Sequence, residues 1–292
     1  MNNRPSAINF FIVGLPLGLV CAIGFSIWLF TKSNDPAQQE SERKFAQTVS
    51  VDSLSDDLRK LTTLIPDRHI GTATTAKNLT RAAAMIDGSL GPSNTGYQTH
   101  RLPGPAEWPL LTVTLEGKNN NAAPVWIVTA YDTRPATTEE TSSAALAATL
   151  AAARALAAES PDRPIHFSFL PHANDPDSPV IETANLLRQQ IAGHPNPHAL
   201  LCIHSIGASD FLAIASRETS AAPLSLIDGL GQSVGAEAIC LTDDTDLASI
   251  LFEMNLPAVL VATQSTDNPR PQTLAGATNR LVTLILRCAK AP

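Results

Sequence analysis

Side chains that could bind a metal ion or move a proton follow several short apolar runs of the sequence. Asp132 comes soon after the run VWIVTA, and Glu140 follows a short way along the chain. His172 follows the run IHFSFL, and His204 lies within the run LLCIHSI. Histidine nitrogens and carboxylate oxygens are common protein ligands of zinc, and both groups serve as general acids and bases. A mononuclear metal site made of Glu140, His172 and His204 is one arrangement that these residues allow.

Each of these residues also has a structural explanation. Glu139 and Glu140 open a predicted helix, where carboxylates complement the positive end of the helix dipole. His172 follows Pro171 in a polar segment that reads as a loop. His204 could simply hydrogen-bond within a cleft. The structural explanation is the simpler one for all of them.

The spacing of apolar residues predicts the elements that would position these side chains. Helical spacing indicates helices at residues 54–65, 75–90, 142–158, 180–192, 224–234, 246–254 and 273–289. Short apolar or alternating runs indicate strands at 97–102, 110–115, 125–130, 165–170, 200–206, 211–215 and 257–263. Strands that alternate with helices predict an α/β sheet covered on both faces. In such a sheet the functional site lies at the carboxyl ends of the strands.

Composition excludes several classes of protein. The 292 residues include 20 Lys and Arg against 27 Asp and Glu, a net charge of −7 without basic clusters, which argues against a nucleic-acid partner. A hydrophobic fraction of 44% with a mean hydropathy near zero excludes a disordered chain and a polytopic membrane protein. No C-x-x-C pair occurs, so we expect Cys202, Cys240 and Cys288 to be buried thiols, with one disulfide plus one free thiol as the alternative.

The N-terminus predicts a membrane anchor. Residues 8–30 contain no charged side chain and are long enough to cross a bilayer, and no signal-peptidase-like site follows them. We therefore expect a tail at 1–7, a single transmembrane helix at 8–30, a linker or stalk at 31–50 and a globular domain at 51–292. Because a short N-terminal tail commonly stays inside, the domain is expected on the extracytoplasmic side.

Several strings near the predicted strand ends resemble those of one enzyme family. They are Pro66-Asp67-Arg68-His69-Ile70-Gly71, VWIVTAYDT, ETSSAA at 140–145, FSFLPHAN and NLPAV at 255–259. Their order resembles that in the di-zinc exopeptidases of metallopeptidase family twenty-eight, which include bacterial aminopeptidases and glutaminyl-cyclase-like enzymes. The resemblance covers the chain from about Leu54 to Leu286. It implies an α/β fold with a mixed, mostly parallel central sheet and helices on both faces.

The resemblance also implies that most metal ligands are missing from their positions. The family's chemistry needs two zinc ions, a bridging carboxylate and a glutamate that acts as a base. Ala130 stands where the first histidine ligand is expected, and Ala173-Asn174 stands where the family has a Glu-Glu pair of base and ligand. His204 stands at an aspartate ligand, and the final histidine would fall near positions 264–265, which hold glutamine and serine.

Two matching positions keep a carboxylate. Glu140 stands at the bridging aspartate, and Asp132 stands at the aspartate that orients the first histidine, which is Ala130 here. Losses on several separate strands predict a site without catalysis. We expect no cofactor, with zinc bound only if Glu140, His172 and His204 form a rewired site.

Other patterns give no second chemistry. His194 and His198 have helical spacing, but Pro195 and Pro197 prevent a helix, so the pair is expected in a solvated loop. The acidic run at 243–246 suits the start of a helix better than a calcium site. The sequence contains no Gly-x-Ser-x-Gly elbow and no Gly-rich phosphate loop.

Three functions remain open. The leading hypothesis is a membrane-anchored, zinc-aminopeptidase-like domain that has lost metal-dependent catalysis and binds a peptide or protein partner, or acts as an envelope scaffold. The alternative is an active metallopeptidase or glutaminyl-cyclase-like enzyme with a rewired metal site. The third is an accessory membrane subunit that acts through its anchor helix, where Gly14, Gly18 and Gly24 would allow close helix packing.

Overall fold

The fold lies in the C-terminal part of the chain. The structure is a computed structural model that describes Gly24 and residues 48–134, 139–217, 236–240, 246–263 and 269–290, with the backbone alone for 139–140 and 236–240. The chain divides into two units, Met1–Lys44 and Phe45–Pro292, and every element below lies in the second. None of the helices in the described ranges is long and apolar enough to cross a membrane. The predicted anchor falls outside those ranges except for Gly24, and so does the predicted helix at 224–234.

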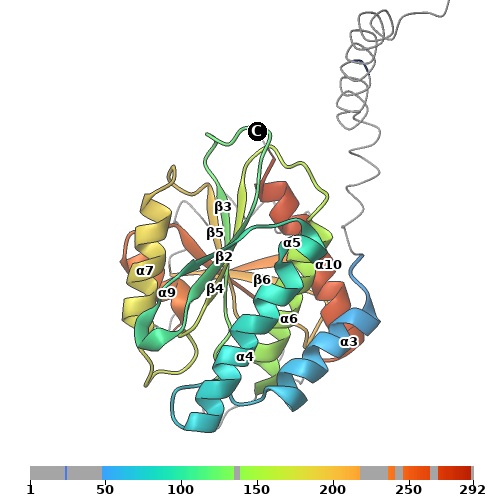
Figure 1. The fold of residues 1–292 in the computed structure, drawn as a ribbon. Helices are drawn as coiled ribbons and strands as arrows, with labels where there is room; N and C mark the ends of the chain where they lie inside the picture. Colours follow the sequence, from blue (N-terminus) through green and yellow to red (C-terminus); the bar gives the residue numbers. More distant parts are fainter. Residues whose placement is uncertain are drawn as a thin grey trace, which may run out of the picture. The chain divides into compact units, whose positions relative to one another are not determined.

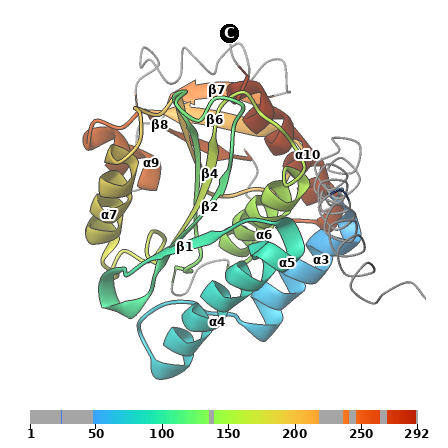
Figure 2. The same cartoon turned by 45° about the horizontal axis from the view of Figure 1, so that its top comes forward.

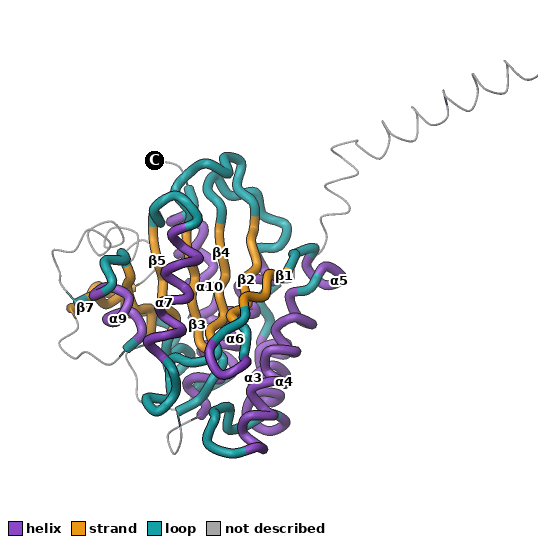
Figure 3. Tube along the Cα trace, turned by 60° about the vertical axis from the view of Figure 1, so that its left-hand side comes forward, coloured by secondary structure: helices purple, strands orange, loops and turns teal. Residues whose placement is uncertain are grey.

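Short apolar segments form the strands of the central sheet. They are β1 (Thr99–Leu102), β2 (Leu110–Leu115), β3 (Val125–Ala130), β4 (Ile165–Leu170), β5 (Ala199–Ile203), β6 (Leu212–Ser216), β7 (Ala236–Cys240) and β8 (Ala258–Ala262). Their order is β1-β2-β4-β3-β5-β8-β6-β7, and Figure 3 shows β1 and β7 at opposite ends. Four strand pairs are parallel and three are antiparallel, so the prediction of a mixed, mostly parallel sheet is confirmed.

Helices cover both faces of this sheet, as predicted. On one face lie α3 (Val51–Arg59), α4 (Ala73–Leu90), α6 (Glu139–Ala155) and α10 (Pro271–Cys288), and on the other lie α7 (Val180–Ala192) and α9 (Leu247–Glu253) (Figures 1 and 2). Short turns complete the described elements: a π-helical turn at Lys60–Leu64, α5 (Pro92–Thr95) and a 3-10 turn at Pro105–Glu107.

Two hydrophobic cores follow from the alternation of side chains along each strand. In β3, Val125 and Ile127 belong to the core under α4, α6 and α10, whereas Trp126 and Val128 belong to the core under α7 and α9. All six residues of β3 are buried. A strand that is buried on both faces reads as a continuous apolar run, which is why this segment was recognisable in the sequence.

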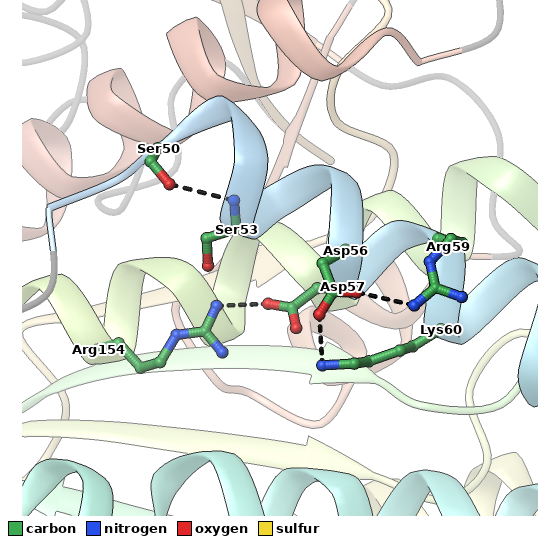
Figure 4. Close-up of polar contacts among 7 residues, drawn as sticks. All are labelled: Ser50, Ser53, Asp56, Asp57, Arg59, Lys60 and Arg154. Atoms are coloured by element: carbon green, nitrogen blue, oxygen red, sulfur yellow. Dashed lines mark hydrogen bonds and ion pairs between the residues drawn. The ribbon is translucent and has the colours of Figure 1, made fainter.

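The N-terminal helix of the domain is joined to α6 by an ion pair. The side chain of Ser50 accepts a hydrogen bond from the backbone N–H of Ser53 and so caps α3. Asp57 of α3 pairs with Arg154 of α6, and both side chains are buried (Figure 4). Asp56 faces the other way, towards Arg59 and Lys60 at the surface.

The boundaries of the elements differ from prediction in a few places. Helix α6 begins at Glu139, a little before the predicted residue 142, and β7 had no predicted counterpart. Cys202 and Cys288 are free and buried, as expected. The side chain of Cys240 and the whole of Cys21 lie outside the described residues.

Candidate functional site

A pocket of about 330 Å³ lies at the carboxyl ends of the neighbouring parallel strands β4, β3, β5 and β8. This is the edge at which an α/β sheet is expected to carry its site. The strand ends, the start of α6 and the start of α9 all contribute to it. Its lining residues are Ala130, Arg134, Thr141, Ser142, Ala173, Asn174, Cys202, Ile203, His204, Asp246, Leu247 and Leu260.

The end of β3 brings Ala130 to the pocket and turns Asp132 away from it. Ala130 lines the pocket with a methyl group, so this position offers no metal donor. Asp132 is fully buried, and its carboxylate accepts hydrogen bonds from the backbone N–H groups of Ala173 (3.0 Å), Asn174 (3.0 Å) and Asp175 (3.2 Å). Asp132 therefore fixes the loop that follows β4.

Burial has the largest effect on the pKa of the Asp132 carboxyl group. It raises the pKa of Asp132 to about 6, against the opposing effect of the three backbone N–H groups and of the charge on Arg68. The side chain of Asn174 adds two further bonds, from Nδ2 to the Asp132 carbonyl at 2.9 Å and to Oδ1 at 3.2 Å. The amide of Asn174 is thus held by Asp132.

Arg68 of the Pro-x-Arg-x-x-Gly string hydrogen-bonds to residues next to the pocket-lining segments at the end of β3 and the start of α6. It is fully buried, and its guanidinium donates to the carbonyl of Tyr131 at 2.8 Å and to Oγ of Ser143 at 2.9 Å. Further bonds reach the carbonyls of Leu61 and Ile65. Arg68 therefore ties the end of β3 to the start of α6 and to the segment after α3.

His172 does not line the pocket. It is fully buried and packs edge-on against Trp108, with 5.9 Å between ring centroids. Burial lowers the pKa of His172, against smaller opposing effects of the Pro105 backbone and of Asp175. His172 and His204 therefore do not share the pocket, and the structure does not bring these two residues of the predicted rewired metal site together.

His204 does line the pocket and is exposed there. Its backbone N–H donates to the carbonyl of Val261 at 3.1 Å, which fixes the end of β5 against β8. Desolvation by the surrounding protein lowers the pKa of the ring, Asp246 raises it, and Arg134 lowers it further. The neutral imidazole is therefore favoured.

Asp246 caps α9, as the sequence predicted. Its Oδ1 accepts from the backbone N–H of Ser249 at 3.0 Å and its Oδ2 accepts from the Ser249 hydroxyl at 2.9 Å. The other acidic residues of that run, 243 and 244, lie outside the described residues. The side chain of Glu140 and positions 264–265 do so as well.

His194 has a contact that the sequence did not reveal. It is exposed in the loop after α7, as predicted, but its ring packs against Trp126 at 5.5 Å and His166 at 4.6 Å between centroids. The backbone N–H of His198, by contrast, donates to the carbonyl of Pro124 at 2.8 Å. No local pattern could indicate this cluster, because Trp126 and His166 come from separate strands.

The described residues do not fit a pair of zinc ions. Ala130 and Ala173 have no donor atom, and the side-chain amide of Asn174 bonds to Asp132. His204 is the one imidazole among the described residues that line the pocket. Nowhere in the described ranges do three His, Cys, Asp or Glu side chains come together in a way that could hold a metal ion.

Comparison with known proteins places the fold. No protein-family profile and no curated protein sequence matches the chain. The LapA aminopeptidase of Legionella pneumophila matches with a TM-score of 0.65 at 12% identity, over 88% of this chain and 75% of that one. BSAP, a zinc aminopeptidase from Bacillus subtilis, matches with a TM-score of 0.64 at 8% identity, over 85% and 96%. The glutaminyl cyclase of Tannerella forsythia matches with a TM-score of 0.56 at 13% identity, over 82% and 99%. The chain therefore has the mixed α/β fold of zinc aminopeptidases and glutaminyl cyclases.

Proposed function

We propose that this chain is a membrane-anchored, zinc-aminopeptidase-like domain without metal-dependent catalysis, and that its pocket binds a peptide or a protein partner. The observation that supports this most directly is the chemistry of the pocket wall. Methyl groups of Ala130 and Ala173 and an amide held by Asp132 occupy three positions at which the resemblance expects ligands and a base.

Hydrolysis on this fold needs a metal-activated water and a carboxylate that accepts its proton. Asn174 cannot act as that base, because a carboxamide does not take up a proton near neutral pH. Asp246 directs both carboxylate oxygens to Ser249. The pocket nevertheless keeps a volume of about 330 Å³ with several polar groups, which suits binding of a small ligand or a chain end.

The test is the zinc content and activity of the full-length chain, purified in mild detergent and dialysed against micromolar zinc. We expect far less than one zinc ion per chain, no zinc-dependent rise in Tm, and no turnover of aminoacyl or glutaminyl substrates. Zinc at about one ion per chain that is lost in His204→Asn but kept in His194→Asn would identify a rewired metal site and overturn the proposal. Zinc-dependent turnover would overturn it as well.

A further inference from the structure

The pocket wall carries a guanidinium and several hydrogen-bond donors that suit an anion. Arg134 and His204 both line the pocket, and they lie close enough that the Arg134 charge acts on the His204 ring. Arg134 makes contacts of its own within the protein. A guanidinium carries five N–H donors in a planar fork, so it can bind a carboxylate in addition to a protein group.

The start of α6 adds to this character. Its first turn contributes Thr141 and Ser142 to the pocket, and α6 is a 17-residue helix. The backbone N–H groups at a helix start carry the positive end of the helix dipole, and hydroxyl groups donate to anions. The pocket therefore offers one cationic side chain, Arg134, beside uncharged hydrogen-bond donors, namely the His204 ring and the hydroxyl groups of Thr141 and Ser142.

Asp246 is the one acidic side chain among the described residues that line the pocket. Its two oxygens accept bonds from Ser249 at 3.0 and 2.9 Å at the start of α9. It lies beside an apolar part of the wall formed by Leu247 and Leu260. The pocket wall thus combines one guanidinium, one capped carboxylate and an apolar part.

We propose that this pocket binds the C-terminal carboxylate of a peptide, with the carboxylate against Arg134 and His204 and the last side chain against Leu247 and Leu260. The inference rests on the proposed function and specifies which end of the peptide is bound. A peptide amino terminus carries a positive charge, which Arg134 would repel. A carboxylate would gain charge-assisted hydrogen bonds at the same place.

The test compares three small peptides on the full-length chain in detergent by isothermal titration calorimetry. N-acetyl-Ala-Leu offers a free carboxylate only, its C-terminal amide offers no charge, and Ala-Leu amide offers a free amine only. We expect N-acetyl-Ala-Leu to bind and its amide to bind at least roughly tenfold more weakly, because a hydrogen bond to a charged group is lost. Binding of the free acid is expected to weaken as salt is added.

Variants assign the binding to this pocket. Arg134→Gln and His204→Asn are each expected to weaken binding of N-acetyl-Ala-Leu by roughly tenfold or more, and Arg134→Lys by less than Arg134→Gln. Arg188→Gln removes the same charge from the exposed surface of α7, away from the pocket lining, and should leave binding unchanged. Unfolding curves of all variants check that the fold is kept. The comparison of the three peptides on the wild-type protein tests the inference even if a variant fails to fold.

The outcomes separate this inference from the proposed function. Tighter binding of Ala-Leu amide than of N-acetyl-Ala-Leu would overturn the carboxylate inference and leave peptide binding in place. No binding of N-acetyl-Ala-Leu at millimolar concentration, or equal binding of its amide, would also overturn the inference. Zinc-dependent hydrolysis of a free-amine peptide would overturn the proposed function itself.

Discussion

At the scale of single residues, the surroundings of Asp132 suit few other side chains, because they present several hydrogen-bond donors to it. Its carboxylate receives hydrogen bonds from the consecutive backbone N–H groups of residues 173–175, and the side-chain amide of Asn174 donates to it as well. A carboxylate is suited to this place because both oxygens accept and neither donates. The shape of the loop between β4 and α7 therefore depends on an acceptor at position 132.

Asp132→Asn is expected to destabilise the fold by on the order of 1–3 kcal/mol, because the new NH₂ group would face N–H donors and leave them unpaired. The measurement is urea unfolding of the full-length protein. Asp177→Asn, an exposed aspartate further along the same loop, is the matched control and should unfold as the wild type does. Equal stability of the two variants would show that the Asp132 carboxylate does not hold the loop.

His166 is a second residue whose environment has consequences. It is buried, stacks on Trp126 at 4.3 Å between centroids, and bonds through Nδ1 to the hydroxyl of Thr114 at 2.9 Å. Burial, with smaller contributions from the neighbouring His194 and His100, lowers its pKa to about 3. The folded state therefore requires the neutral ring.

Acid should destabilise the protein through His166. The unfolded chain takes up a proton near pH 6.5 but the folded ring does so only near pH 3, so this stabilisation is complete above pH 6.5 and is lost progressively as the pH falls towards 3. The expected loss is on the order of 2 kcal/mol between pH 7 and pH 5. Unfolding at a series of pH values measures it. His166→Phe should flatten this dependence and His69→Gln should not; a parallel pH profile of His166→Phe and the wild type would contradict the assignment.

At the scale of elements, the contact between α3 and α6 is the one with the sharpest energetic consequence. Asp57 and Arg154 pair where both side chains are buried, whereas Asp56 pairs with Arg59 and Lys60 at the surface (Figure 4). A buried charge that loses its partner is costly, but an exposed one is solvated by water. The two aspartates are adjacent in sequence, but one ion pair is buried and the other is exposed.

Arg154→Met should therefore cost on the order of 3–5 kcal/mol of unfolding free energy, because the methionine keeps the packing but leaves Asp57 buried and unpaired. Thermal and urea unfolding measure the loss. Arg59→Gln, which breaks the exposed pair, should have little effect. Adding Asp57→Leu to Arg154→Met should recover much of the stability. A double variant no more stable than Arg154→Met alone would contradict this explanation.

Sequence periodicity recovered the elements of this sheet where both faces are buried. Strands β2, β3 and β4 have the predicted bounds, and so does α7, because their apolar residues are continuous or regularly spaced. Strand β7 was missed, since Ala236–Cys240 is short and its run of alanines is interrupted by a glutamate. The early start of α6 was missed because its first residues are polar.

The site was only partly accessible to the same reasoning. Placement at the strand ends brought Ala130, Ala173, Asn174 and His204 together as expected. The inward turn of His172 could not be foreseen, because it depends on Trp108 in a distant loop. Arg134 was also missed, since its role depends on sharing a pocket with residues of three other strands and no local motif marks it.

At the scale of the whole molecule, the chain combines two units of different composition. Residues 8–30 carry no charge, and the elements of the α/β domain begin with Val51, capped by Ser50. The uncharged length suits a single bilayer span. If residues 8–30 span a membrane, as we propose, the domain is held near the membrane surface.

Deletion of residues 8–30 should move the protein from the membrane fraction to the soluble fraction, because the apolar span supplies the membrane affinity. Alkaline carbonate extraction followed by immunoblotting measures this. Deletion of residues 31–44, which shortens the polar linker and keeps the span, is the control and should remain in the membrane.

Protease added to intact spheroplasts should digest the domain if it is extracytoplasmic. A domain that is protected until the cells are lysed would reverse the expected orientation, and a full-length chain extracted by carbonate would contradict the anchor.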